Sequence, residues 1–272
     1  MIFTSYFDES DTHGPAPTVV MAAFVGHAAQ WRRFEKRLPK IQKRHGFRVF
    51  HSKRFKSRTG EFAGWSDQKC EALRKDMIDL SYKLTMGVVV SLEHGRFMQE
   101  YRAPPIPNKM HMDSQYGACF RACLGYLLQF LEERENKDRL NVVIENGHPN
   151  VGDCARIFHD LKKLWAESGA NVLGSFTIET KESCPPLMAA DMLAHTRAMM
   201  KDNPSKVRAN LKAAGVPFPA YTGPGGLHLL ELKPNALADL KSGFEKLRGL
   251  RIKAWRAKKA ARKASSPGEG KK

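Results

Sequence analysis

The chain has 272 residues, of which 42% are hydrophobic and 27% are charged, proportions that are ordinary for a soluble globular protein. Its charge balance is not ordinary, because 45 Lys and Arg against 28 Asp and Glu give a net charge of +17, which favours polyanionic partners. No apolar run, including the one around residues 88–90, approaches the roughly 20 residues of a membrane-spanning helix, so we expect no membrane partner.

The first ninety residues predict three strands and two helices. We expect strands at residues 2–7, 18–26 and 84–93 and helices at 29–45 and 66–83. The first strand should end at Asp8, and Ser66 should cap the second helix, whose first turn carries Asp67. Between the two helices we expect a short extended piece at 47–51, followed by a polar loop that contains glycine.

The remainder of the chain predicts two further strands, each followed by a helix. The expected elements are a long helix at 114–135, a strand at 140–144 ending in Glu145, a helix at 151–168, a strand at 171–180 and a helix at 185–200. Prolines predict a surface loop at 103–108, and proline with glycine predicts another at 217–226. A last helix should begin after Pro234 and continue into a basic tail, in which residues 246–272 hold eleven Lys or Arg and one acid.

The order of these elements favours one fold. Three strands, a helix, a strand, a helix, a strand and a helix, with two extra helices between the second and third strands, match the order of the RNase H fold. We therefore predict an α/β, RNase H-like domain at 1–232, with a mixed five-stranded sheet flanked by helices and a helical insertion at about 27–83. Residues 233–272 should form a basic C-terminal helix and a disordered tail.

Three acids occupy positions that are otherwise apolar. Asp8 ends the first strand, Glu145 ends the fourth, and Asp191 lies within the apolar helical run 187–194. A buried charge is costly unless it is paired or bound to a cation, although one isolated acid is more often structural than catalytic. In the RNase H order the three acids should converge at one sheet edge. Two Mg²⁺ or Mn²⁺ ions about 3.5–4 Å apart would there activate water and stabilise the leaving oxygen of a phosphodiester.

Short motifs in a fixed order span roughly residues 1–200. They are Asp8-Glu9-Ser10 after an apolar strand, Phe50-His51 between the second and third strands, and Ala190-Asp191 in a late apolar helix preceded by Lys181 and Ser183. In these motifs the chain resembles an uncharacterised bacterial and phage family, domain of unknown function three-eight-zero-zero, which is placed in the RNase H-like superfamily. The chain departs from that family by having Asp11 where glycine usually follows, and Glu145 where aspartate is often found. The resemblance implies the fold and, through the superfamily, metal-dependent nuclease activity.

Three further residues complete the predicted site. Glu9 should point to the opposite face of the strand from Asp8, unless the strand ends at Asp8 and a turn redirects Glu9 toward the metals. His51 would orient a phosphate or shuttle a proton, and its alternative is a half-buried structural histidine. Lys181 would contact a phosphate or neutralise the acids, and its alternative is a solvated lysine. The predicted catalytic residues are thus Asp8, His51, Glu145, Lys181 and Asp191, and the predicted metal ligands are Asp8, Glu9, Glu145 and Asp191.

The sequence supports two main functional hypotheses. The first is a Mg²⁺- or Mn²⁺-dependent nuclease acting on DNA or RNA, whose basic body and tail hold the phosphates. The second is a catalytically silent nucleic-acid-binding subunit of a larger bacterial or phage assembly, favoured by the two departures from the family pattern. A small-molecule phosphodiesterase or phosphatase is a third alternative, which would not need the basic tail. A protein partner or a homo-oligomer remains open.

The cysteines bear on the compartment. They are odd in number and include no CxxC pair, so we expect reduced, buried thiols rather than a disulfide framework: Cys70, Cys119, Cys123, Cys154 and Cys184. The first residues lack the basic and apolar stretches of a secretory signal. Both observations favour a cytoplasmic protein.

Overall fold

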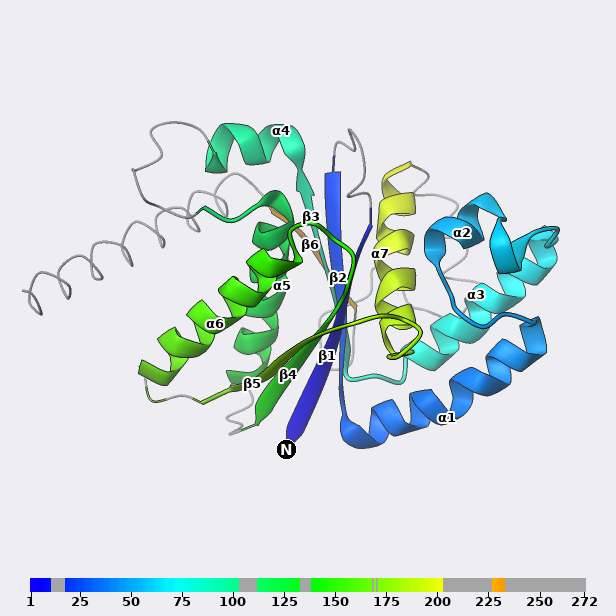
Figure 1. Cartoon of the computed structure of the whole chain (residues 1–272), viewed down its shortest axis with the longest axis horizontal. Coiled ribbons are helices and arrows are strands. Elements are labelled where there is room, and N and C mark those ends of the chain that lie inside the picture. Colours follow the sequence, from blue (N-terminus) through cyan, green and yellow to red (C-terminus); the bar gives the residue numbers. More distant parts are fainter. Residues whose placement is uncertain are drawn as a thin grey trace, which may run out of the picture. The chain divides into compact units, whose positions relative to one another are not determined.

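A mixed sheet organises the larger of two units in the computed structural model of the chain (Figure 1). The structure describes residues 1–10, 18–102, 112–132, 138–167, 169, 171–202 and 227–232. The larger unit comprises Met1–His94 and Asp113–Glu231, and the smaller comprises Gly95–Met112 and Leu232–Lys272. In the smaller unit, the described part contains a short π-helical turn, η2 (Phe97–Tyr101), which follows α4 (His94–Arg96). The predicted loops at 103–108 and 217–226 and the predicted C-terminal helix lie outside the described residues.

The sheet has the order β5-β4-β1-β2-β3-β6. Its strands are β1 (Ile2–Ser10), β2 (Thr18–His27), β3 (Met86–Glu93), β4 (Arg139–Glu145), β5 (Leu173–Glu179) and β6 (Leu227–Glu231). The first three strands pair antiparallel in sequence order, whereas β4 pairs parallel to β1 and β5 parallel to β4. All five predicted strands are present. The sixth, β6, was not predicted, and it pairs parallel to β3 at the far edge.

Helices cover both faces of this sheet. They are α1 (Ala28–His45), α2 (Ser52–Ser57), the 3₁₀ turn η1 (Gly60–Phe62), α3 (Asp67–Ser81), α5 (Gln115–Glu132), α6 (Val151–Glu167) and α7 (Leu187–Asp202). Helix α5 packs on β2 and β3, with α6 beside it, and α7 packs on β1 and β2 on the opposite face (Figure 1). The fold class is therefore α/β with a mixed open sheet between two helical layers. No helix in the described part combines the length and apolar composition that crossing a membrane requires.

The segment between β2 and β3 forms a helical layer outside α7. Its buried rings contact one another, since Phe62 lies 5.2 Å from Phe55 and 5.0 Å from Trp65 between ring centroids. The same apolar cluster includes Met188 and Met192 of α7, so one face of α7 contacts the sheet and another closes the core of the insertion. The insertion is thereby fixed against the helix that carries Asp191.

Two predictions about the secondary structure need correction, one in this segment and one in the first strand. The polar loop expected after residue 51 contains α2 and η1, because Phe55 and Phe62 are buried against the insertion core and order the chain around them. The first strand does not end at Asp8 but continues to Ser10, since Glu9 and Ser10 pair with Met21 and Val20 of β2.

The predicted cap of α3 is confirmed, because the Ser66 hydroxyl accepts a hydrogen bond from the Lys69 backbone N–H at 3.2 Å. Replacing Ser66 with alanine is expected to lower the free energy of unfolding by about 1 kcal/mol, the usual cost of leaving that N–H without its partner. Urea unfolding followed by circular dichroism measures the change. Ser66→Asn, which keeps an acceptor oxygen, is the control, and equal stability of the alanine and asparagine variants would contradict the capping role.

Candidate metal centre

The register of the two central strands places Asp8 and Glu145 side by side. Phe7 of β1 pairs with Ile144 of the parallel strand β4, so the next residue along each strand is an acid. Asp8 is buried, with 1% of its surface exposed, and Glu145 is half-buried at the end of its strand. The predicted convergence of these two carboxylates is therefore observed, and it follows from parallel pairing of apolar strands that both end in an acid.

Lys181 joins the acids from three separate elements. Its ammonium nitrogen lies 2.9 Å from Asp8 Oδ2, 2.7 Å from Glu145 Oε2 and 2.9 Å from Asp191 Oδ2. The lysine follows β5 and is itself buried, with 4% of its surface exposed. A solvated lysine is thus excluded, and the ammonium contacts all three acids, as expected if Lys181 neutralises them.

Asp191 is held in place by the insertion. The Ser52 backbone N–H donates to Asp191 Oδ2 at 3.0 Å, and the Ser52 hydroxyl donates to the Asp191 backbone oxygen at 3.2 Å. Ser52 is buried and begins α2, directly after His51. Sequence reasoning missed Ser52, and the only signal for it was its position beside the Phe50-His51 motif.

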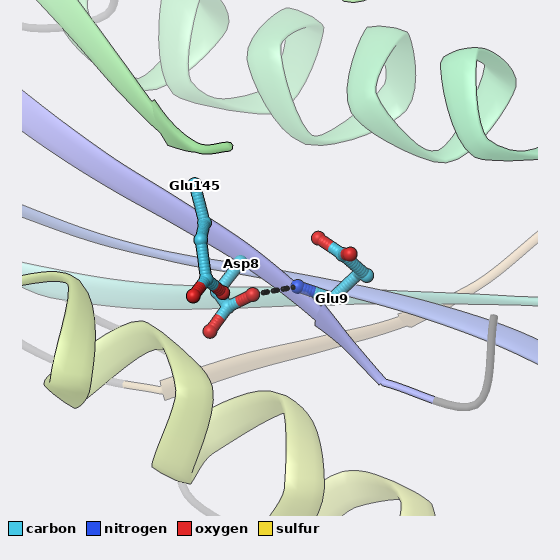
Figure 2. Close-up of side chains that lie close together, drawn as sticks. All are labelled: Asp8, Glu9 and Glu145. Atoms are coloured by element: carbon cyan, nitrogen blue, oxygen red, sulfur yellow. Dashed lines mark hydrogen bonds between the residues drawn. The ribbon is translucent and has the colours of Figure 1, made fainter. Parts of the chain in front are cut away.

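Glu9 lies close to the other two strand acids, Asp8 and Glu145, even though its side chain projects from the opposite side of β1 to that of Asp8. Figure 2 shows the Glu9 and Asp8 side chains on opposite sides of the strand, as the alternation of an extended backbone requires. The Glu9 backbone N–H donates to Asp8 Oδ1 at 2.7 Å, and the Tyr116 hydroxyl of α5 lies 3.5 Å from Glu9 Oε2. Burial and the Glu145 carboxylate raise the pKa of Glu9 to about 7.

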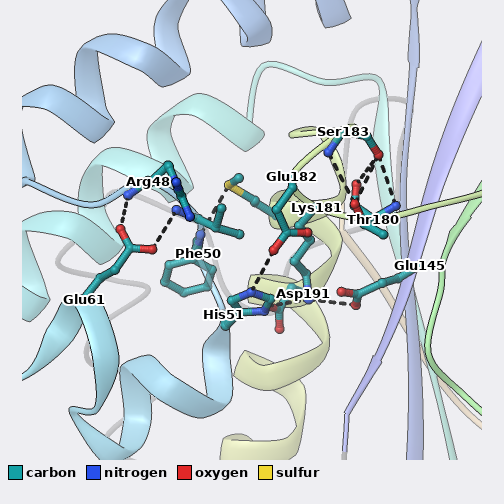
Figure 3. A network of polar contacts seen from close by, with 12 residues as sticks. Arg48, Phe50, His51, Glu61, Glu145, Thr180, Lys181, Glu182, Ser183 and Asp191 are labelled. Carbon is teal, nitrogen blue, oxygen red and sulfur yellow. Dashed lines mark hydrogen bonds and ion pairs between the residues drawn. The ribbon is translucent and has the colours of Figure 1, made fainter.

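His51 lies at the margin of this cluster. Its Nε2 is 3.7 Å from Glu182 Oε1, and Figure 3 shows the ring near Glu182, Lys181 and Asp191. The ring is half-buried, while the Glu182 side chain is 57% exposed. The structure therefore pairs His51 with a surface acid that the sequence did not single out, and places it directly before Ser52, which contacts Asp191.

One ammonium does not balance the charge of this cluster. Lys181 contacts three carboxylates, and Glu9 is a fourth close by. Burial and the carboxylates of Asp191 and Glu145 raise the pKa of Asp8 well above its ordinary value, although Lys181 opposes this shift. Burial alone would lower the pKa of Lys181, but the acids outweigh it and raise that pKa. The cluster thus favours the uptake of a further positive charge, which a proton or a metal cation would supply.

The donor set fits a hard divalent cation. One carboxylate oxygen from each of Asp8, Glu9 and Glu145 lies within 4.8 Å of the other two. Mg²⁺ takes oxygen ligands at about 2.0–2.1 Å in an octahedron, which sets ligand oxygens roughly 3–4 Å apart, so small side-chain rotations would close this group around an ion. Asp8 Oδ2 faces Lys181 without the geometry of a hydrogen bond and has no hydrogen-bond partner among the described residues. A metal ion bound by that oxygen would compete with the Lys181 ammonium, which lies 2.9 Å from it.

Comparisons of the sequence with known proteins give no match, either to a protein-family model or to a curated protein.

Proposed function

We propose that the chain is an RNase H-like nuclease that depends on divalent metal ions and hydrolyses phosphodiester bonds of DNA or RNA. The strand order β5-β4-β1-β2-β3, antiparallel for the first three strands and parallel for β4 and β5, supports the RNase H-like assignment. The observation that carries the proposal is the meeting of Asp8, Glu145 and Asp191, from two strands and a helix, around a single ammonium.

Each residue has a distinct role in this proposal. Asp8, Glu9 and Glu145 would hold the metal, and Asp191 would complete the ligand set from the helical side. A divalent ion bound there supplies positive charge and polarises water for attack on phosphorus. Lys181 would limit the repulsion among the acids, and Ser52 would keep the Asp191 carboxylate oriented.

The test is cleavage of labelled single- and double-stranded DNA and RNA in Mg²⁺ or Mn²⁺. Wild-type protein should cleave at least one substrate, EDTA should abolish cleavage, and Asp191→Asn should reduce the rate by about a hundredfold or more, which corresponds to about 2.7 kcal/mol. Asp79→Asn removes the same charge from an exposed position on α3 and should leave the rate unchanged. Thermal melting of both variants separates lost chemistry from lost folding.

The position of Lys181 supports one alternative, a nucleic-acid-binding subunit without chemistry of its own. Its ammonium already contacts three of the four acids, as a structural ion cluster would require. This alternative expects binding of oligonucleotides without cleavage, no heat of Mn²⁺ binding by calorimetry, and no effect of Asp191→Asn on binding. Cleavage that EDTA abolishes would exclude it.

A further inference from the structure

The positive charge of the chain is concentrated in two segments. Residues 28–83 contain sixteen Lys or Arg and six Asp or Glu, a net charge of +10, and residues 246–272 contribute another +10. Residues 84–245 contain eighteen of each sign, and residues 1–27 carry only three acids. Within the fold that the structure describes, the excess of positive charge therefore belongs to the helical insertion.

Most of these cations are exposed and form no ion pair with an acid among the described residues. Fourteen of the sixteen side chains are exposed, and the remaining two, Lys69 and Arg74, are half-buried. In residues 28–83, all of which the structure describes, only three of the sixteen form an ion pair with an acid: Arg44 with Asp76, Arg58 with Asp67, and Arg74 with Glu71. Glu61 is occupied otherwise, because its carboxylate accepts the backbone N–H groups of Arg48 and Val49.

Helix α2 brings part of this charge to the metal centre. Its first residue, Ser52, donates to Asp191, and α2 packs against α7 (Figure 1). The following residues Lys53, Arg54 and Lys56 are exposed and form no ion pair within the described residues. Consecutive Cα atoms are about 3.8 Å apart, so these cations begin one residue from a contact to a proposed metal ligand.

We propose that Lys53, Arg54 and Lys56 form a phosphate-binding surface that holds the nucleic-acid backbone beside the metal centre. This inference rests on the proposed function and names the surface through which the substrate is held. A strand with one phosphate at the carboxylates has flanking phosphates within reach of these side chains, and each neutralised phosphate releases a counterion.

The apolar residues in and directly after α2 indicate how the surface of Lys53, Arg54 and Lys56 binds. The apolar residue of α2, Phe55, is buried, so α2 presents no apolar side chain that could enter an anionic bilayer. The rings of Phe62 and Trp65 are also buried and cannot stack on bases. Recognition by this surface is therefore electrostatic, and we expect it to be independent of sequence and steeply dependent on salt.

The experiment compares two triple variants of the full chain with equal changes in charge. One is Lys53→Gln with Arg54→Gln and Lys56→Gln, and the other is Lys36→Gln with Lys40→Gln and Lys43→Gln on the exposed surface of α1. Fluorescence anisotropy measures binding of labelled 30-nucleotide single- and double-stranded DNA and RNA in EDTA across a salt series. The α2 variant should bind about tenfold or more weakly, with the salt slope reduced by about two to three, whereas the α1 variant should change affinity about threefold or less.

Further controls separate the effect of charge from changes in folding and from binding to other partners. A charge-preserving variant, Lys53→Arg with Arg54→Lys and Lys56→Arg, should bind as wild type does, which separates charge from any change in folding. Equal losses in the α1 and α2 variants, or unchanged binding by the α2 variant, would overturn the proposal. The proposal would also be overturned if wild-type protein bound anionic phosphatidylserine vesicles and the α2 variant lost that binding while its oligonucleotide binding was unchanged. Binding is measured without metal, so it tests this surface separately from cleavage. Wild-type protein that binds oligonucleotides through α2 but never cleaves them would refute the proposed nuclease activity and still support the phosphate-binding surface.

Discussion

Replacing Lys181 with methionine is expected to destabilise the metal-free protein by about 3–5 kcal/mol, the usual cost of removing one partner from a buried ion pair. The change leaves Asp8, Glu145 and Asp191 facing one another without the ammonium that now contacts all three. Methionine has nearly the same length as lysine, so the packing of the long side chain is kept and the lost charge dominates.

Urea unfolding in EDTA measures the loss, and repeating it with Mg²⁺ or Mn²⁺ tests its cause. A divalent ion that binds only the folded state should restore more stability to Lys181→Met than it adds to wild-type protein, because the variant has more uncompensated negative charge. Lys83→Met, at an exposed position, should change stability by no more than about 0.5 kcal/mol. A loss below about 1 kcal/mol for Lys181→Met, or no difference in the effect of metal, would show that Lys181 does not neutralise the acids.

The second large effect is expected away from the Lys181 cluster, at Asp113. This buried carboxylate accepts hydrogen bonds from Arg121 Nε at 2.6 Å and Arg121 Nη2 at 3.0 Å, and it also pairs with Arg156 of α6. Asp113→Asn removes the charge that two guanidinium groups share, and should cost about 3–5 kcal/mol of stability.

Chemical unfolding followed by circular dichroism tests the role of Asp113, with Asp160→Asn as the matched control. Asp160 meets the same Arg156 at 3.4 Å, but its side chain is 36% exposed, so its loss should cost no more than about 1 kcal/mol. Metal binding by Asp113→Asn, measured by calorimetry at a temperature where it is folded, should match wild type. Equal effects of the two substitutions would show that burial of Asp113 adds nothing to this pair.

The parts of the site that the sequence predicts are those that depend on regular strands. Two apolar strands that each end in an acid need only parallel pairing to bring Asp8 and Glu145 together, and that pairing is observed. An acid inside an apolar helix is likewise conspicuous, which is why Asp191 could be predicted to lie with the other two acids before its contacts were known. The cap at Ser66 is a local interaction and was predictable for the same reason.

What sequence reasoning could not supply depends on contacts between distant segments. Lysine is usually exposed, so only the assembled fold shows that Lys181 is buried among acids from β1, β4 and α7. Ser52 contacts a residue 139 positions away, and its place beside the Phe50-His51 motif does not identify that residue. Helix α2 has six residues and one buried apolar side chain, too few for a periodic pattern, and β6 is defined by its pairing with β3.

The shared core of the insertion and α7 also constrains how the chain reaches its native state. The insertion is complete in sequence by residue 83, yet its apolar cluster includes Met188, Ala189 and Met192. During synthesis, the aromatic core of the insertion therefore stays incomplete until about a hundred further residues have been made and its last packing partners are available. Contacts of such long sequence separation slow folding and leave apolar surface exposed in the interval. The nascent chain is consequently most exposed to aggregation and to chaperone binding before α7 emerges, and a fragment ending ahead of residue 187 should not fold as an independent unit.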